Sequence, residues 1–128
     1  RTKNNEVSEI TRTLKIMAKE LSVPVVLLSQ LNREVERRTD KIPILADLRD
    51  SGAIEQDADV VLFIHREHYY NDNANKHDGI VRIAKNREGM VGDVKFWVDE
   101  TISDFRDEAP RNSTFVSGNY ERDDDLPF

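Results

Sequence analysis

Two cations, Lys85 and Arg87, stand two residues apart just before a stretch that contains Gly89 and Gly92. Side chains alternate between the two faces of a β-strand, so residues i and i+2 point the same way. If this stretch is a hairpin, Lys85 and Arg87 stand side by side near its tip. Arginine offers phosphate oxygens a planar fork and lysine offers them a compact charge. From the residues alone, a solubilising pair of surface cations remains the simpler interpretation.

Gln30 is a second candidate, because it follows the apolar run 25–28 and Ser29. Ligands of open α/β sheets bind at the carboxyl ends of the strands. A glutamine at that place can orient a water molecule or donate a hydrogen bond to a phosphate oxygen without adding charge. A polar residue that simply leaves the core at the end of a strand explains the position equally well.

A third candidate is the short run Arg49, Asp50, Ser51 and Gly52, which places a cation beside a serine and a flexible glycine. Backbone N–H groups next to a glycine can approach a phosphate closely. The alternative is an ordinary stop at the C-terminal end of a helix.

Carboxylates and histidines also occur in groups, but none of them predicts a metal site. A solvated approach to a strand explains Asp57 and Asp59 better than metal binding or acid–base chemistry. His65 and His68 lie in a hydrophilic stretch without an evident third ligand. The sequence has no GxxxxGK[ST] phosphate loop and no GxSxG nucleophile elbow, so no local motif establishes an independent enzyme.

The elements that must position these residues follow from the hydrophobic pattern. Helical spacing predicts a helix over residues 7–21, with Asn5 as its N-cap and Pro24 limiting its end to Leu21 or Ser22. The unbroken apolar runs 25–28 and 60–64 predict strands that are buried on both faces of a parallel sheet. Between these runs we expect a short helix or a loop over 31–41, and a helical stretch over 45–48 that is interrupted at Ser51-Gly52.

The later part of the chain predicts antiparallel structure. Residues 80–85 and 93–99 alternate and are joined by a glycine-containing connection, which predicts a hairpin. Residues 102–106 can add an edge strand. This order is typical of the second half of an α/β sheet domain. From residue 109 the sequence has no usable period, so we expect one domain over 1–108 and a mobile acidic tail over 109–128.

Composition limits the class of protein. The 128 residues suffice for one domain with its own core. The net charge of −6 argues against general binding of nucleic acid through a basic surface but allows a local basic patch. The absence of cysteine excludes a disulfide framework, and no apolar run approaches the ~18 residues of a membrane span. The first residues are neither a signal peptide nor a methionine start, so we expect a cytoplasmic protein or a piece of one.

Three longer stretches, "AKELSVPVVLLSQLNREVERR", "DLRDSGAIEQDADVVLFIHRE" and "IAKNREGMVGDVKF", occur in this order. In order and spacing they resemble the C-terminal part of DnaB-type replicative DNA helicases, over residues 6–107. The resemblance implies the C-terminal half of a RecA-like P-loop NTPase domain, with a helix, buried parallel strands and an antiparallel hairpin. It also implies a homohexameric ring that uses ATP and Mg²⁺ to move 5′ to 3′ along single-stranded DNA and to unwind the replication fork. Primase and a helicase loader are the implied protein partners.

The resemblance also implies roles at the nucleotide. Gln30 matches the sensor that links the state of the γ-phosphate to the DNA-facing loops. Lys85 and Arg87 match paired cations that reach into the ATP site of the neighbouring subunit, with Arg87 as the arginine finger. The Walker A loop and the acidic Walker B strand of the family lie upstream of the first helix. ATP and Mg²⁺ are therefore expected to be held mainly by residues outside this chain, which should be inactive alone.

At the DNA, the resemblance places Arg49, Asp50 and Gly52 at positions that meet the sugar-phosphate backbone, partly through main-chain N–H groups. The final "DDDLPF" resembles the acidic, hydrophobic-ended tips of bacterial single-stranded-DNA-binding proteins, although plain solvation explains it as well. Two alternatives remain for the whole chain. One is another RecA-family ATPase, such as a phage or recombination helicase, and the other is a non-catalytic interaction fragment.

Overall fold

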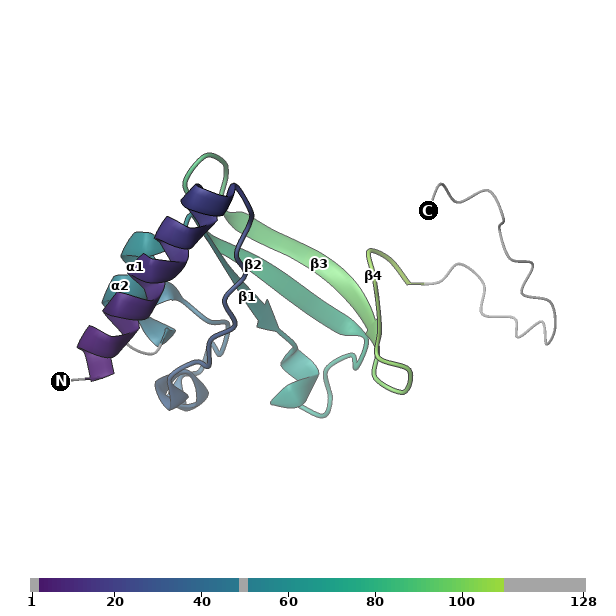
Figure 1. The fold of residues 1–128 in the computed structure, drawn as a ribbon. Coiled ribbons are helices and arrows are strands. Elements are labelled where there is room, and N and C mark those ends of the chain that lie inside the picture. Colours follow the sequence, from purple (N-terminus) through teal and green to yellow (C-terminus); the bar gives the residue numbers. More distant parts are fainter. Residues whose placement is uncertain (1–2, 49–50, 110–128) are drawn as a thin grey trace, which may run out of the picture.

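The computed structural model describes residues 3–48 and 51–109, which form helices packed against one end of a four-stranded antiparallel sheet (Figure 1). The elements in chain order are α1 (Lys3–Leu21), η1 (Arg33–Arg37), η2 (Leu45–Asp47), α2 (Ser51–Asp57), β1 (Val60–His65), η3 (Glu67–Tyr69), β2 (Asp78–Asn86), β3 (Gly92–Asp99) and β4 (Asp104–Arg106). The strand order is β1-β2-β3-β4, so each strand pairs with its neighbours in sequence. In this described part, no helix has the length and apolar character to cross a membrane.

The helix α1 ends where the sequence predicts but begins earlier. Ser22 adopts a left-handed φ of 51°, and the Val23 N–H donates to the Ala18 carbonyl at 3.1 Å, which closes the helix as a Schellman-type turn. The N-cap prediction is wrong, because Asn5 lies inside the first turn of a helix that starts at Lys3. A single capping residue is a weak signal when the residues before it can also adopt helical geometry.

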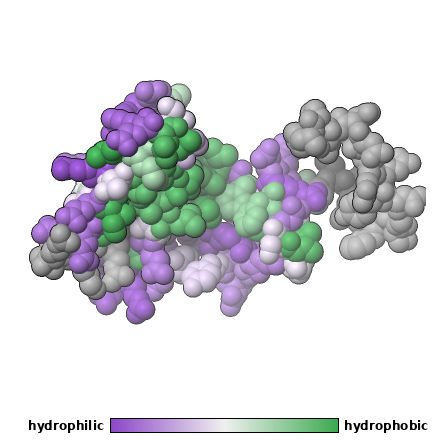
Figure 2. Space-filling model, viewed as in Figure 1, coloured by the Kyte–Doolittle hydropathy of each residue, from purple (hydrophilic) through white to green (hydrophobic). Residues whose placement is uncertain are grey.

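The segment 23–30 has no regular secondary structure, so the strand predicted for residues 25–28 is wrong. Its side chains are exposed, with Leu28 at 91%. Figure 2 shows hydrophobic residues gathered on the face of the molecule that this segment crosses. The cause is the lack of a partner: among the described residues, no strand forms a ladder with the segment, and an apolar run alone does not make a strand.

The strand predicted for residues 60–64 is confirmed as β1, but its neighbours differ from those predicted. It pairs with β2 in the antiparallel direction, from Val60↔Asn86 to His65↔Ile80. Its burial alternates along the strand, with one face buried and the other exposed. The expectation of a parallel strand buried on both faces is therefore wrong. The described elements cover only one face of β1, where Phe63 packs in the core.

The core beneath β1 joins the sheet to the short helices. Leu48, Val61 and Phe63 form its centre, and partly buried apolar side chains surround them: Leu31, Leu45, Ile54, Ala58 and Ala84. The predicted hairpin is confirmed by the pairing of β2 with β3, and the predicted edge strand is confirmed as β4. The connection after β2 returns to the ladder at Gly92, whose φ of 156° is a backbone conformation that side chains disfavour.

The loop between the segment 23–30 and α2 is fixed by a buried carboxylate. Asp47 accepts two hydrogen bonds from the Arg38 guanidinium, at 2.5 and 2.7 Å, and a third from the Ile44 N–H at 2.8 Å. The bond from Arg38 is the main reason why the pKa of Asp47 lies below its ordinary value.

The helix α2 begins at the Ser51-Gly52 pair, so the prediction that this pair interrupts a helix is wrong. Serine is favoured at the start of a helix and glycine just after its end, so the pair alone does not show whether a helix begins or ends there.

Candidate functional site

Lys85 and Arg87 do stand side by side, as their spacing predicts. Lys85 is the penultimate residue of β2, and Arg87 directly follows the end of that strand. The Lys85 ammonium donates to the carbonyl of Glu55, and the Arg87 Nη2 donates to the carbonyl of Gln56 at 3.2 Å. Both carbonyls belong to the last turn of α2, where backbone acceptors lack partners within the helix and favour cations. The end of α2 therefore holds the two cations together.

Asp59 is the second anchor of Arg87. Its Oδ1 lies 2.9 Å from the Arg87 Nη1 and 2.5 Å from the Nζ of Lys15 on α1. The Arg87 backbone N–H also donates to the Asp59 carbonyl at 2.9 Å. The hydrogen bond from Lys15 is the main reason why the pKa of Asp59 is lowered, and the positive charges of Lys15, Arg87 and Lys19 add to it.

Sequence reasoning missed the role of Asp59, which it explained as a solvated residue before a strand. Its partner Lys15 is 44 residues away, so no local spacing could have linked them. The structure shows that Asp59 joins three parts of the chain: α1, the approach to β1 and the end of β2.

An open cleft of about 610 Å³ lies beside this cluster. Its lining residues come from α1, the start of β1 and the end of β2: Lys15, Ala18, Lys19, Val23, Asp59, Val60, Asn86, Arg87 and Glu88. The Arg87 side chain is 48% exposed, so it remains accessible while it is anchored. A surface with three cations and two carboxylates can receive an anionic group, provided that the group reaches Arg87 from outside the chain.

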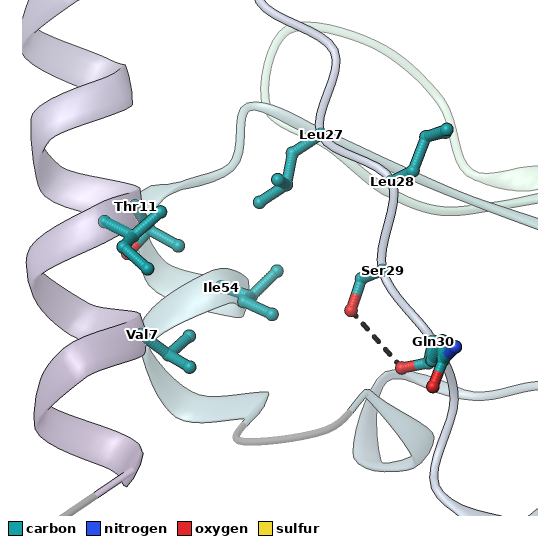
Figure 3. A pocket seen from close by; sticks show the side chains of 8 residues that line it. Val7, Thr11, Leu27, Leu28, Ser29, Gln30 and Ile54 are labelled. Atoms are coloured by element: carbon teal, nitrogen blue, oxygen red, sulfur yellow. Dashed lines mark hydrogen bonds between the residues drawn. The ribbon is translucent and has the colours of Figure 1, made fainter.

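Gln30 lies in a different place. Figure 3 shows it at one end of a cavity of about 310 Å³ between α1, α2 and the segment 27–30, where Ser29 donates to the Gln30 carbonyl at 3.3 Å. Val7, Leu27 and Ile54 make most of this cavity apolar. Gln30 and Arg87 line different cavities that have no lining residue in common, and Lys85 lines neither of them.

Of the three residues predicted to meet DNA, only Gly52 lies in the described part of the chain; Arg49 and Asp50 lie outside it. Gly52 is the second residue of α2 and is exposed. A Cβ added at this position meets no atom within 4 Å. Among the described residues, none lies close enough to require a glycine at this position.

The family model for the DnaB-like helicase C terminal domain matches residues 1–107. This chain belongs to that family. It is 49% identical over 123 residues to the replicative DNA helicase DnaB of Rickettsia bellii, an alignment that covers 79% of this chain and 25% of the relative. The chain spans about a quarter of the length of the curated relatives it matches.

Two solved structures support the assignment to the DnaB-like family. One, described as an ATPase domain, matches with a TM-score of 0.80 and 46% identity, over 83% of this chain and 38% of that one. A DnaB-like replicative helicase, described together with its interactions with primase, matches with the same TM-score and identity over 83% of this chain and 26% of that one. The predicted fold class, an α/β part of a DnaB-like ATPase domain, is confirmed.

The DnaB-like family implies the use of a nucleotide, and the residues present fit only part of such a site. Lys85 and Arg87 can face phosphate oxygens, but the sequence contains no GxxxxGK[ST] loop to cradle them. Within residues 3–48 and 51–109, no three metal-ligating side chains gather. His65 Nε2 lies 2.8 Å from a Glu67 carboxylate oxygen, whereas His68 Nδ1 lies 3.0 Å from the Ala74 carbonyl, so the two histidines serve separate contacts.

Proposed function

We propose that this chain is part of an ATP-dependent replicative DNA helicase that moves 5′ to 3′ along single-stranded DNA as a homohexamer. Membership of the DnaB-like family over residues 1–107 supports the helicase class. The observation that carries the proposal is the anchored pair Lys85 and Arg87, two adjacent cations of which Arg87 lines an open cleft with its side chain 48% exposed. Such cations suit phosphate oxygens, and we propose that the neighbouring subunit of the ring binds the nucleotide that carries them.

Arg87 supplies the electrostatic part of the reaction. When bound, ATP would supply the phosphoryl group and Mg²⁺ would neutralise part of its charge. Catalysis of phosphoryl transfer is mostly positioning and electrostatics. A guanidinium has five N–H groups. Arg87 directs Nη2 to the Gln56 carbonyl and Nη1 to Asp59, which leaves further N–H groups for phosphate oxygens. Lys85 adds a second charge beside it. Because Lys85 and Arg87 contact the nucleotide of the neighbouring subunit, hydrolysis depends on ring assembly.

Gln30 and the DNA-facing residues complete the proposal. Gln30 senses the γ-phosphate through its terminal amide, and Arg49, Asp50 and Gly52 meet the DNA backbone. A solved relative is described with its interactions with primase, which supports primase as a partner. We also propose a helicase loader as a partner.

The test removes Arg87 from the full-length protein. Arginine fingers that act in trans contribute about 10³–10⁵ in turnover, so Arg87→Ala should depress ATP hydrolysis by this order while ATP affinity changes little. The matched control is Arg82→Ala, which removes an arginine within β2 whose bonds run to Asp93 on β3 at 2.9 and 3.0 Å. The control should hydrolyse ATP at the normal rate.

Mixed rings test the trans assignment directly. Protomers with a disabled Walker A loop retain Arg87, and Arg87→Ala protomers retain the Walker A loop, so each supplies what the other lacks. Mixing them should restore part of the hydrolysis that both have lost. Mixed rings that form but stay as inactive as the separate variants would show that Arg87 does not act on a neighbouring subunit.

A further inference from the structure

Arg87 is fixed at both its main chain and its side chain by one residue. The Asp59 carbonyl accepts the Arg87 backbone N–H at 2.9 Å, and the Asp59 carboxylate lies 2.9 Å from Nη1. Gln56 holds the other terminal nitrogen, Nη2, at 3.2 Å. Two anchors on the two terminal nitrogens of a planar group set the orientation of its plane. A long arginine side chain otherwise samples many rotamers that must be ordered before it can act.

Lys15 makes the Asp59 anchor more rigid. The Asp59 side chain is 57% exposed, and a single exposed ion pair holds its partners weakly. Here the same Oδ1 atom also accepts a hydrogen bond from the Lys15 ammonium at 2.5 Å. Lys15 projects from α1, the longest helix of the described chain. The carboxylate is thus tied to a helix on one side and to Arg87 on the other.

We propose that Asp59, tied to α1 by Lys15, is a positioning residue that presents Arg87 to the phosphate of the adjacent subunit. This inference rests on the proposed role of Arg87 in hydrolysis. In this proposal Asp59 acts only through Arg87, by setting the place and plane of the guanidinium. The N–H groups that neither Asp59 nor Gln56 engages remain for the phosphate, so these contacts orient Arg87 without using all of its donors.

The test measures kcat and KM for ATP in the full-length protein. A displacement of about 1 Å can cost ~10²-fold in rate, so Asp59→Asn should lower kcat by about tenfold or more, with KM for ATP nearly unchanged. Lys15→Met leaves the contact between Asp59 and Arg87 in place and should lower kcat less. It also serves as the second variant if Asp59→Asn fails to assemble.

A matched control is available two residues away. Asp57 also reaches α1, because its Oδ2 accepts the Thr11 hydroxyl at 2.6 Å, but this carboxylate does not bond to Arg87 in the described part of the chain. Asp57→Asn changes the same chemical group on the same stretch of chain and should leave kcat unchanged. An equal loss of kcat in Asp57→Asn and Asp59→Asn would show a general structural effect and overturn the inference.

A double-mutant cycle separates this inference from the role of Arg87. If Asp59 acts through Arg87, then Asp59→Asn should cause no further loss in an Arg87→Ala background. If Arg87→Ala itself leaves kcat unchanged, the proposed function of Arg87 fails. Suppose instead that Arg87→Ala lowers kcat. If Asp59→Asn then leaves kcat unchanged, or lowers it by the same factor with and without Arg87→Ala, only the positioning role of Asp59 fails. A rise in kcat for Asp59→Asn would also overturn it, because Asp59 would then restrain Arg87.

Discussion

The strand β1 and the segment 23–30 are both short runs of large apolar residues, yet they differ in structure. β1 forms a ladder with β2 and buries Phe63, which is only 4% exposed. The segment runs without a ladder among the described residues and leaves Leu28 91% exposed. Both runs lead toward proposed nucleotide residues: the β1–β2 ladder supports Lys85 and Arg87, and the segment ends at Gln30.

The difference is one of partners rather than of composition. β1 obtains its partner from the chain that follows it, through the connection that contains η3. Hydrogen-bonding groups of an extended segment need an adjacent strand, and apolar character alone does not supply one. Lys85 and Arg87 therefore have anchors from other elements of this chain, directly from α2 and, for Arg87, through Asp59 and Lys15 from α1. The Gln30 side lacks comparable side-chain anchors among the described residues.

The largest expected effect compares the two runs directly in the 128-residue chain. Phe63→Ala should lower the free energy of unfolding by about 3–5 kcal/mol, because it opens a cavity in the core. Leu28→Ala should change it by no more than about 0.5 kcal/mol, as an exposed position does. Urea denaturation measures both.

The control for this comparison lies on β1 itself. Leu62 is the neighbour of Phe63 on the exposed face, so Leu62→Ala should behave like Leu28→Ala. Equal costs at Phe63 and Leu28 would contradict the difference between the two runs. Phe63→Ala and Leu28→Ala can also be compared in the full-length protein. A larger loss of unfolding free energy for Leu28→Ala in that protein would show that residues outside this chain cover Leu28.

Local patterns predicted the elements whose partners are near in sequence. The end of α1 at Leu21 follows from Pro24, and the β2–β3 hairpin follows from alternation around a glycine-containing connection. The parallel strands were wrong because an unbroken apolar run reports hydrophobicity and not the direction or presence of a partner. The shared face of Lys85 and Arg87 followed from the period of a strand. The contact of Arg87 with Asp59 did not, because tertiary packing alone brings the two together.

An intermediate effect is expected at the loop that tethers the segment to β1. The Asn32 N–H donates to the Asp47 carbonyl at 2.6 Å, so the buried Asp47 holds the chain just beyond Gln30. Asp47→Asn should lower the free energy of unfolding at pH 7 by about 1.5–3 kcal/mol, the usual contribution of hydrogen bonds to a charged group. Asp93→Asn, at the exposed ion pair with Arg82, is the control and should cost less.

The cost of Asp47→Asn should depend on pH. The pKa of Asp47 is lowered in the folded state, chiefly by the hydrogen bond from Arg38, relative to an ordinary value of 3.8. A lowered folded-state pKa stabilises the fold above the unfolded-state value, and this contribution is lost as the pH falls through the folded-state pKa. The difference between wild type and Asp47→Asn should therefore be constant near neutral pH and shrink below about pH 4. Urea titrations at several pH values measure it, and a difference that grows in acid would contradict the assigned pair.

The smallest expected effect is at Gly52 in α2, the helix that contacts both Arg87 and the cavity beside Gln30. Ile54 lines the cavity that ends at Gln30, and the Gln56 carbonyl holds Arg87. Alanine favours a helix over glycine by up to about 1 kcal/mol, and a Cβ at Gly52 meets no atom within 4 Å, so Gly52→Ala should raise the stability of this chain slightly. If DNA approaches the Gly52 backbone, the same methyl group should weaken single-stranded DNA binding by the full-length protein. Fluorescence anisotropy measures that affinity.

The neighbouring residue supplies the control that separates helix stability from DNA approach. Ala53→Gly lowers the helix propensity of α2 without adding an atom, so it should reduce stability and leave little steric effect on DNA. Opposite changes in stability with weaker DNA binding only in Gly52→Ala would place the DNA at Gly52. If the two variants change binding in opposite directions, in step with their opposite effects on the stability of α2, the helix acts through its rigidity. Unchanged affinity in Gly52→Ala would remove Gly52 from the DNA path and leave α2 as the support of Arg87 alone.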